Sequence, residues 1–95
     1  MFVVTLTYTA PAERVDAVRG EHRDWLDQHV ASGLLLVAGP QVPRTGGVFI
    51  VSSKLDREAL TAGLKEDPFH IHGVADYAIV EFEPTKINPA LAALV

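Results

Sequence analysis

The chain has 95 residues, of which 48% are hydrophobic, carries a formal net charge of −4 and contains no cysteine. This length fits one domain with one modest core, and the lack of cysteine excludes disulfides, thiolate chemistry and cysteine-based zinc sites. The basic residues are scattered singly along an acidic chain, which argues against a nucleic-acid partner. No window reaches the roughly 20 apolar residues of a membrane span, and no signal-like segment precedes the first strand. We therefore expect a cytoplasmic protein with no membrane partner.

The first two predicted elements are a strand and a long helix. Phe2 to Tyr8 is rich in β-branched and aromatic residues, which favours a strand. Pro11 suits the first turn of a helix predicted over Pro11 to Gly33, because its missing N–H costs nothing there. Apolar positions in this helix recur at steps of three and four, as expected for one buried face. This stripe consists of Val15, Val18, His22, Trp25, Leu26 and His29. A titratable ring, His22, therefore occupies the middle of the buried face.

The remaining segments contain three predicted strands and one predicted helix. The strands are Leu34–Gly39, Val48–Ser52 and Ala75–Glu83, and the helix runs from an N-cap at Asp56 to about Glu66. Pro68 ends this helix, since the residue before a proline is pushed out of helical geometry. Residues 84–95 form a C-terminal tail in which Asn88 can cap a short helix.

The element order β-α-β-β-α-β predicts a ferredoxin-like α+β fold. Residues 1–95 then form a single domain with a four-stranded antiparallel sheet and two helices on one face. The strands are apolar on both faces, as the pairs Val3–Val4 and Phe49–Ile50 illustrate. Two helices cover only one face, so the other needs a partner. We expect a homodimer that packs sheet against sheet.

His22 and Asp67 are the candidate catalytic residues. Asp67 continues the apolar stripe of Leu60 and Leu64 at a step of three, and both helices should pack on the same sheet face. A carboxylate that accepts from a histidine N–H fixes the ring tautomer and raises its basicity, as a general base requires. Such a pair also occurs in cores, where it only ties two helices together. The spacing alone leaves both alternatives open.

The other polar and aromatic candidates are less specific. His29 is expected to bond the last carbonyls of its helix. His70 and His72 would face one way if extended, but no third ligand stands at a zinc-like spacing, so we predict no metal site. Tyr8 and Phe69 fit either the core or a pocket wall. Ser52 and Ser53 lack the glycine-flanked turn of a nucleophile elbow, which argues against serine chemistry.

The order and spacing of several short motifs resemble the YCII-related (YciI-like) family. These motifs are His22 followed by Trp25-Leu26, then Gly33-Leu34-Leu35, Ala38-Gly39-Pro40, and Asp67-Pro68-Phe69 with Gly73. The resemblance extends from Phe2 to about Pro84. It implies a ferredoxin-like subunit of a dimeric α/β barrel with a His–Asp pair at its site. Gly39, Pro40 and Phe69 then look like pocket lining, and we add Tyr8 to these predicted substrate-binding residues.

The resemblance implies chemistry on small cyclic molecules, since the family includes a dehydrochlorinase and the wider superfamily a muconolactone isomerase. We therefore predict a small cofactor-free lyase or isomerase in which His22 moves a proton and Asp67 orients it. The alternative is a non-catalytic ligand-binding or assembly domain. The chain departs from the family pattern in two places: His70 and His72 lie outside the motif, and the connection from Gln41 to Gly47 is short. Because this connection is expected to border the pocket, the substrate is expected to differ from those of known members.

Overall fold

The computed structural model describes residues 1–94 and has the predicted ferredoxin-like α+β fold. Its elements follow the order expected from the sequence, with one additional short helix. They are β1 (Phe2–Tyr8), α1 (Ala12–Ala31), β2 (Leu35–Pro40), β3 (Gly46–Val51), α2 (Arg57–Leu64), α3 (Pro68–Ile71), β4 (Ala75–Glu81) and the single-turn 3-10 helix η1 (Pro89–Leu91).

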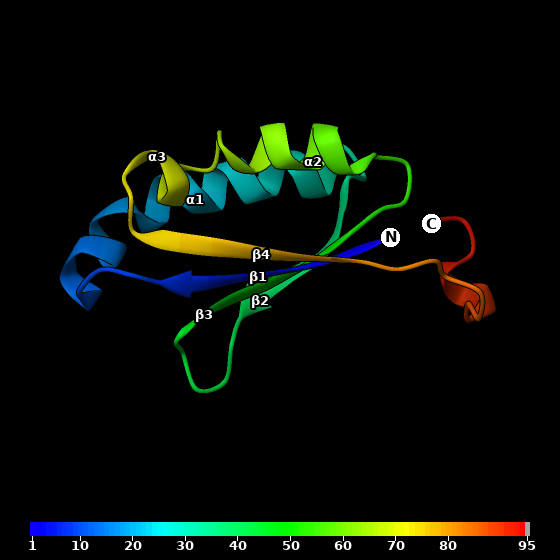
Figure 1. Ribbon diagram of the computed structural model, residues 1–95, viewed down its shortest axis with the longest axis horizontal. Coiled ribbons are helices and arrows are strands. Elements are labelled where there is room, and N and C mark those ends of the chain that lie inside the picture. The colour runs from blue at the N-terminus through cyan, green and yellow to red at the C-terminus, as the bar shows by residue number, and fades with distance from the viewer. Residues whose placement is uncertain (95) are drawn as a thin grey trace.

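The four strands form one antiparallel sheet in the order β2-β3-β1-β4. All three α-helices lie on the same face of this sheet, and no helix among residues 1–94 covers the other face (Figure 1). The prediction of helices on one face is confirmed, although there are three of them rather than two.

Strand residues alternate between the two faces, as the period of a β-strand requires. Phe2, Val4 and Leu6 of β1 point toward the helices and are almost completely buried. They join side chains of α1 and α2, such as Val15 and Leu60, in one hydrophobic core. The uncovered face is also apolar, with Val3 of β1 between Ile50 of β3 and Val80 of β4. Val80 is 61% exposed, so this face has the character of an unpaired surface.

The ends of α1 agree with the sequence to within one or two residues. Pro11 occupies the N-cap position and the helix ends at Ala31. Gly33 follows with φ +83°, the left-handed conformation that glycine adopts without a steric penalty. Asp56 caps α2 as predicted, since its side chain accepts a hydrogen bond from the Ala59 N–H.

The second helix ends two residues before the predicted end at about Glu66, and the placement of Asp67 on its apolar stripe is wrong. α2 ends at Leu64. Asp67 has extended backbone geometry and is the N-cap of α3, with Pro68 at the first helical position. A short polar side chain followed by proline is a strong helix start signal. Pro68 thus both prevents α2 from continuing and begins a new helix.

Two glycines bring the start of β3 close to β1. A Cβ on Gly46 would lie 1.8 Å from the Leu6 carbonyl oxygen, a distance that no side chain tolerates. A Cβ on Gly47 would meet the Gly39 oxygen at 3.2 Å and the Leu6 side chain at 3.6 Å. Residue 47 therefore contributes only backbone to the sheet, next to the Gly39 carbonyl and the Leu6 side chain.

The C-terminal tail leaves the sheet after β4 and runs to one end of the molecule (Figure 1). Asn88 accepts a hydrogen bond from the Ala90 N–H and caps the turn η1, as the sequence predicts. Val95, the last residue of the predicted tail, lies outside the described residues. Within residues 1–94, every helix is too short or too polar to span a bilayer, and the cytoplasmic location stays a prediction.

Candidate active site

His22 lies on the face of α1 that packs against the sheet, as its position in the apolar stripe predicts. Only 7% of its surface is exposed. Its ring stacks on that of Phe69, with centroids 3.8 Å apart and planes within 6° of parallel. Phe69 is the second residue of α3, so this stacking joins the two helices and fixes the plane of the imidazole.

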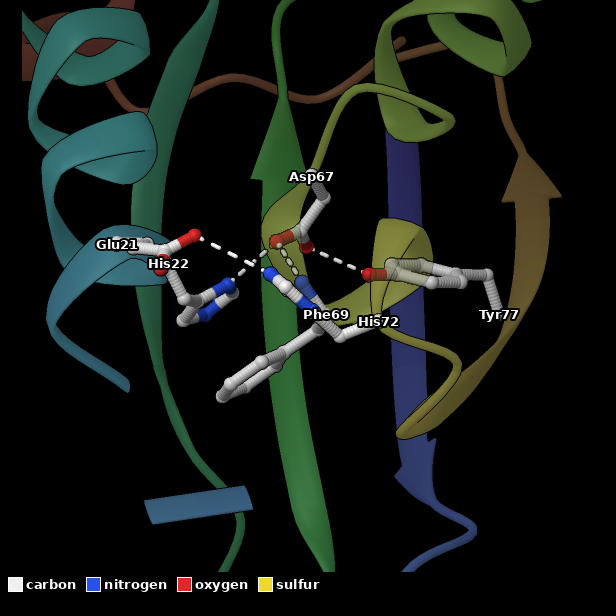
Figure 2. A network of polar contacts seen from close by, with 6 residues as sticks. All are labelled: Glu21, His22, Asp67, Phe69, His72 and Tyr77. Atoms are coloured by element: carbon white, nitrogen blue, oxygen red, sulfur yellow. Dashed lines mark hydrogen bonds and ion pairs between the residues drawn. The ribbon is translucent and has the colours of Figure 1, made fainter. Parts of the chain in front are cut away.

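Asp67 meets His22 directly, as predicted, although it does so from a helix N-cap. Its Oδ1 lies 2.7 Å from Nδ1 of His22 and also accepts from the Phe69 N–H at 3.0 Å. Its Oδ2 accepts from the Tyr77 hydroxyl at 2.6 Å. Figure 2 shows the carboxylate between these groups, which come from α1, α3 and β4. Asp67 is fully buried, and three hydrogen bonds to its oxygens compensate for the lost hydration.

These hydrogen bonds determine which nitrogen of His22 is available for chemistry. An ionised carboxylate only accepts, so Nδ1 carries the hydrogen that bonds Asp67. The neutral ring then holds its lone pair on Nε2, and no group among residues 1–94 is hydrogen-bonded to that atom. This is the arrangement of a histidine general base whose orientation is set by a carboxylate.

Tyr77 is the third member of the network and was not identified from the sequence. Burial, the hydrogen bond to Asp67 and the nearby negative charge all raise the pKa of the Tyr77 hydroxyl above its ordinary value. The phenol therefore stays protonated and donates to Asp67 throughout the range in which proteins are stable. β-strand alternation alone places Tyr77 toward the helices, but no sequence signal links it to Asp67.

A cavity of about 330 Å³ opens beside His22. Its volume is at the lower end of the range for small-molecule sites. The lining residues come from β1, α1, β2, β3, the β2–β3 loop and α3: Leu6, Tyr8, Arg19, His22, Arg23, Leu26, Gly39, Pro40, Arg44, Gly47, Phe49 and Phe69. All four predicted substrate-binding residues line this cavity, whereas Asp67 lies behind His22 and does not.

Three arginines line this cavity that were not identified as site residues from the sequence. Arg19 stands three residues before His22 on α1 and shares its helix face, and Arg23 follows Arg19 at a step of four. This spacing was a usable signal. Arg44 comes from the loop between β2 and β3, and its guanidinium carbon lies 5.8 Å from the centre of the Tyr8 ring.

The remaining histidines lie outside the cavity lining. His70 belongs to α3 and presents its ring to the edge of Tyr77. His72 is the C-cap of α3 and its Nε2 lies 3.3 Å from the Glu21 carboxylate. The two residues are not extended and face different partners, contrary to the sequence prediction. His29 packs against the Trp25 ring rather than bonding a helix carbonyl among residues 1–94.

Across the described part of the chain, no group of three or more histidine and carboxylate side chains could hold a metal ion. His22 and Asp67 are bonded to each other, and their remaining neighbours in the network are a phenol and a backbone amide. The prediction that no metal or cofactor is needed stays a prediction.

The fold and site together define a small ferredoxin-like domain with a buried His–Asp pair beside a ligand-sized cavity. The chain belongs to the YCII family, because the model of the YCII-related domain matches residues 1–83. The family resemblance seen in the motifs is thereby confirmed. No curated protein sequence matches the chain.

Among solved structures, the chain is similar to 5-chloro-2-hydroxyhydroquinone dehydrochlorinase (TftG) from Burkholderia phenoliruptrix, in complex with 2,5-dihydroxybenzoquinone. The TM-score is 0.69 at 16% sequence identity, and the match covers 87% of this chain and 94% of that one. At this identity the likeness establishes a shared fold.

Proposed function

We propose that this protein is a lyase or isomerase that acts on a small cyclic or aromatic-derived molecule, with His22 as the general base and Asp67 as the residue that orients it. One observation carries the proposal: His22 is held by Asp67 through Nδ1 and lines a cavity in which Nε2 has no partner among residues 1–94. Structural core histidines are expected to use both ring nitrogens within the protein.

The reaction begins when Nε2 removes an acidic proton from the substrate. The electron pair of the broken bond moves into the substrate's π system. In a lyase reaction such as dehydrochlorination, a new double bond forms and chloride leaves with the electron pair of the carbon–chlorine bond. In an isomerisation, the imidazolium returns the proton to another atom of the substrate. The imidazolium that forms in either case is stabilised by the negative charge of Asp67.

The comparisons support this proposal at the level of fold and substrate type. TftG, whose fold this chain shares, is a dehydrochlorinase of a chlorinated quinol. The predicted pocket residues Tyr8, Gly39, Pro40 and Phe69 surround the cavity beside His22, with two aromatic rings among them. The aromatic and apolar part of the cavity wall suits a planar ring.

Turnover assays on a defined panel test the proposal. Chlorinated hydroxyquinols, beginning with 5-chloro-2-hydroxyhydroquinone, are followed by chloride release, and unsaturated lactones by the appearance of their isomers in NMR spectra. His22→Gln removes the base at nearly constant volume and should lower kcat by about 10²- to 10⁴-fold. His29→Gln is the matched control on the same helix, outside the cavity lining, and should keep wild-type rates. Wild-type rates in His22→Gln would overturn the role of this residue.

A second function is supported by the burial of Asp67. Because this carboxylate joins α1, α3 and β4, the His–Asp pair also suits a ligand-binding domain in which it is purely structural. The two functions predict different results in binding and turnover experiments. A structural pair predicts ligand binding with no turnover of any panel compound, and equal binding by wild type and His22→Gln.

The uncovered sheet face supports a homodimer. Its apolar residues include Val3, Val48, Ile50 and Val80, which lie on the face without helices (Figure 1). A second copy of the chain offers the same face, and two such faces can bury each other around a two-fold axis. Val80→Lys should shift the wild-type dimer toward monomer in analytical ultracentrifugation. Val30→Lys, an equivalent change on the exposed side of α1, should not, and a monomeric wild type would contradict the proposal.

A further inference from the structure

The charge of the cavity is opposite in sign to that of the protein. The chain has a net charge of −4, yet three arginines are among the residues that line the cavity: Arg19, Arg23 and Arg44. Among residues 1–94, no aspartate or glutamate contributes to the lining. Asp67 is enclosed behind His22 and its oxygens are occupied by three donors. The formally charged side chains of the lining are therefore all basic, in a protein that is acidic as a whole.

Two of these arginines have only a partial set of partners. Arg19 pairs with the exposed Asp16 through Nη2, and no hydrogen bond within residues 1–94 uses its Nη1. Arg44 approaches the same Asp16 at 3.7 Å and is 46% exposed. A guanidinium carries five N–H donors in a planar fork that matches an oxyanion. Arg19 and Arg44 thus retain donors for a ligand, and their shared contact with Asp16 brings them to one side of the cavity.

The other walls are apolar and flat. Leu6 and Leu26 contribute aliphatic surface, and the rings of Tyr8, Phe49 and Phe69 provide aromatic surface. Such walls favour the body of a planar, weakly hydrated molecule. A simple inorganic anion such as phosphate would leave this surface in contact with water, whereas a ring that carries a negative oxygen uses both kinds of wall.

We propose that the ligand of this cavity is a planar cyclic oxyanion, a ring bearing a carboxylate, phenolate or enolate oxygen that binds to Arg19 and Arg44. This inference rests on the proposed function, because it names the substrate class of the same site. It also explains how the arginines assist the chemistry. When Nε2 of His22 takes a proton from a monoanionic substrate, the substrate gains a second negative charge, which can be delocalised onto the oxygen facing the guanidinium groups. Positive groups placed where negative charge develops lower the barrier.

Isothermal titration calorimetry with matched probes tests the charge requirement. The probes are benzoate, which carries a carboxylate, 2,5-dihydroxybenzoquinone, which ionises at its enolic hydroxyls, and benzamide, a neutral molecule of the shape of benzoate. We expect benzoate or 2,5-dihydroxybenzoquinone to bind at least tenfold more tightly than benzamide near neutral pH, which is the contribution of one charge-assisted hydrogen bond. The tighter of the two anions shows whether the site prefers a carboxylate or an enolate.

Variants then locate the binding groups. Arg19→Gln and Arg44→Gln should each weaken the bound anion at least tenfold and leave benzamide within about twofold. Arg19→Lys and Arg44→Lys keep the charge but lose the planar fork, so they should bind more weakly than wild type. Arg57→Gln on α2 is the control, because it makes the same change in net charge at an exposed residue outside the cavity. Thermal unfolding verifies that each variant is folded, and the exposed Arg44 carries the test alone if Arg19→Gln unfolds.

Three results would overturn the inference: no binding of either anion, equal affinity for benzamide, or unchanged anion affinity in both glutamine variants. The catalytic proposal fails separately. Arginine-dependent anion binding by a protein that turns over no panel compound would support the anionic ligand and contradict catalysis by His22.

Discussion

Two histidine–carboxylate pairs connect α1 with α3, and they use neighbouring residues of α1. His22 meets Asp67 at 2.7 Å, and Glu21 meets His72 at 3.3 Å (Figure 2). The first pair is almost fully enclosed, with side-chain exposures of 9% and 0%, whereas the second is 64% and 48% exposed. The chemical groups are the same in both pairs. Enclosure and additional donors, rather than the presence of a His–carboxylate contact, therefore distinguish a candidate catalytic pair from a surface contact.

The largest expected difference between the pairs follows from removing the buried carboxylate. Asp67→Ala leaves the Phe69 N–H, the Tyr77 hydroxyl and His22 Nδ1 without their acceptor, and breaking a buried pair in this way costs about 3 to 5 kcal/mol. We expect this loss in the free energy of unfolding measured with urea. Asp67→Asn is the control for volume and should lose less, because its amide keeps one acceptor oxygen. A loss below about 1 kcal/mol for Asp67→Ala would show that the network contributes little to stability.

A smaller effect is expected for Tyr77→Phe, which removes one hydrogen bond to Asp67 while preserving the ring. The expected cost is about 1 to 2 kcal/mol near neutral pH. The pKa of Tyr77 is raised in the folded protein, so the folded state holds this proton more tightly than the unfolded chain does. The stabilisation is therefore complete below the unfolded pKa of about 10 and declines as pH rises above it. Urea titrations from neutral to alkaline pH should show wild type and Tyr77→Phe converging above that pH, and a constant difference would contradict this assignment.

The smallest effect is expected at the exposed pair. Glu21→Gln and His72→Gln, combined in a double-mutant cycle, should give a coupling energy below about 0.5 kcal/mol, because water and salt screen an exposed contact. The turnover of panel compounds and the affinity for anions should be unchanged in both variants, since neither Glu21 nor His72 lines the cavity. A coupling as large as that of the buried pair would remove the distinction drawn between them.

The sequence predicted the elements that depend on local patterns. β1 was predicted with its observed bounds, because its seven residues are rich in β-branched and aromatic side chains and a clear turn follows them. The α1 stripe placed His22 on the buried face, and Asp56 and Gly33 marked helix ends through their own cap chemistry.

The site was predicted in part, and partly for the wrong reason. Asp67 was expected to reach His22 by continuing the stripe of the second helix, but it does so as the N-cap of α3. The spacing Leu60, Leu64, Asp67 fits a helix, and the Asp67-Pro68 start signal overrides it. Tyr77 and Arg44 could not be assigned from local patterns, because their contacts with Asp67 and Tyr8 depend on how β4 and the β2–β3 loop pack. Such contacts are long-range and appear only in the folded chain.

The bare backbone at Gly47 has a consequence for which ligands the cavity can admit. Residue 47 lines the cavity, and a methyl group there would crowd the Gly39 carbonyl and the Leu6 side chain. The space available to a ligand is thus limited at this point by a hydrogen atom rather than by a side chain. A side chain at this one position would reduce the size of molecule that the cavity admits, and the charged groups and the His22–Asp67 pair would stay as they are.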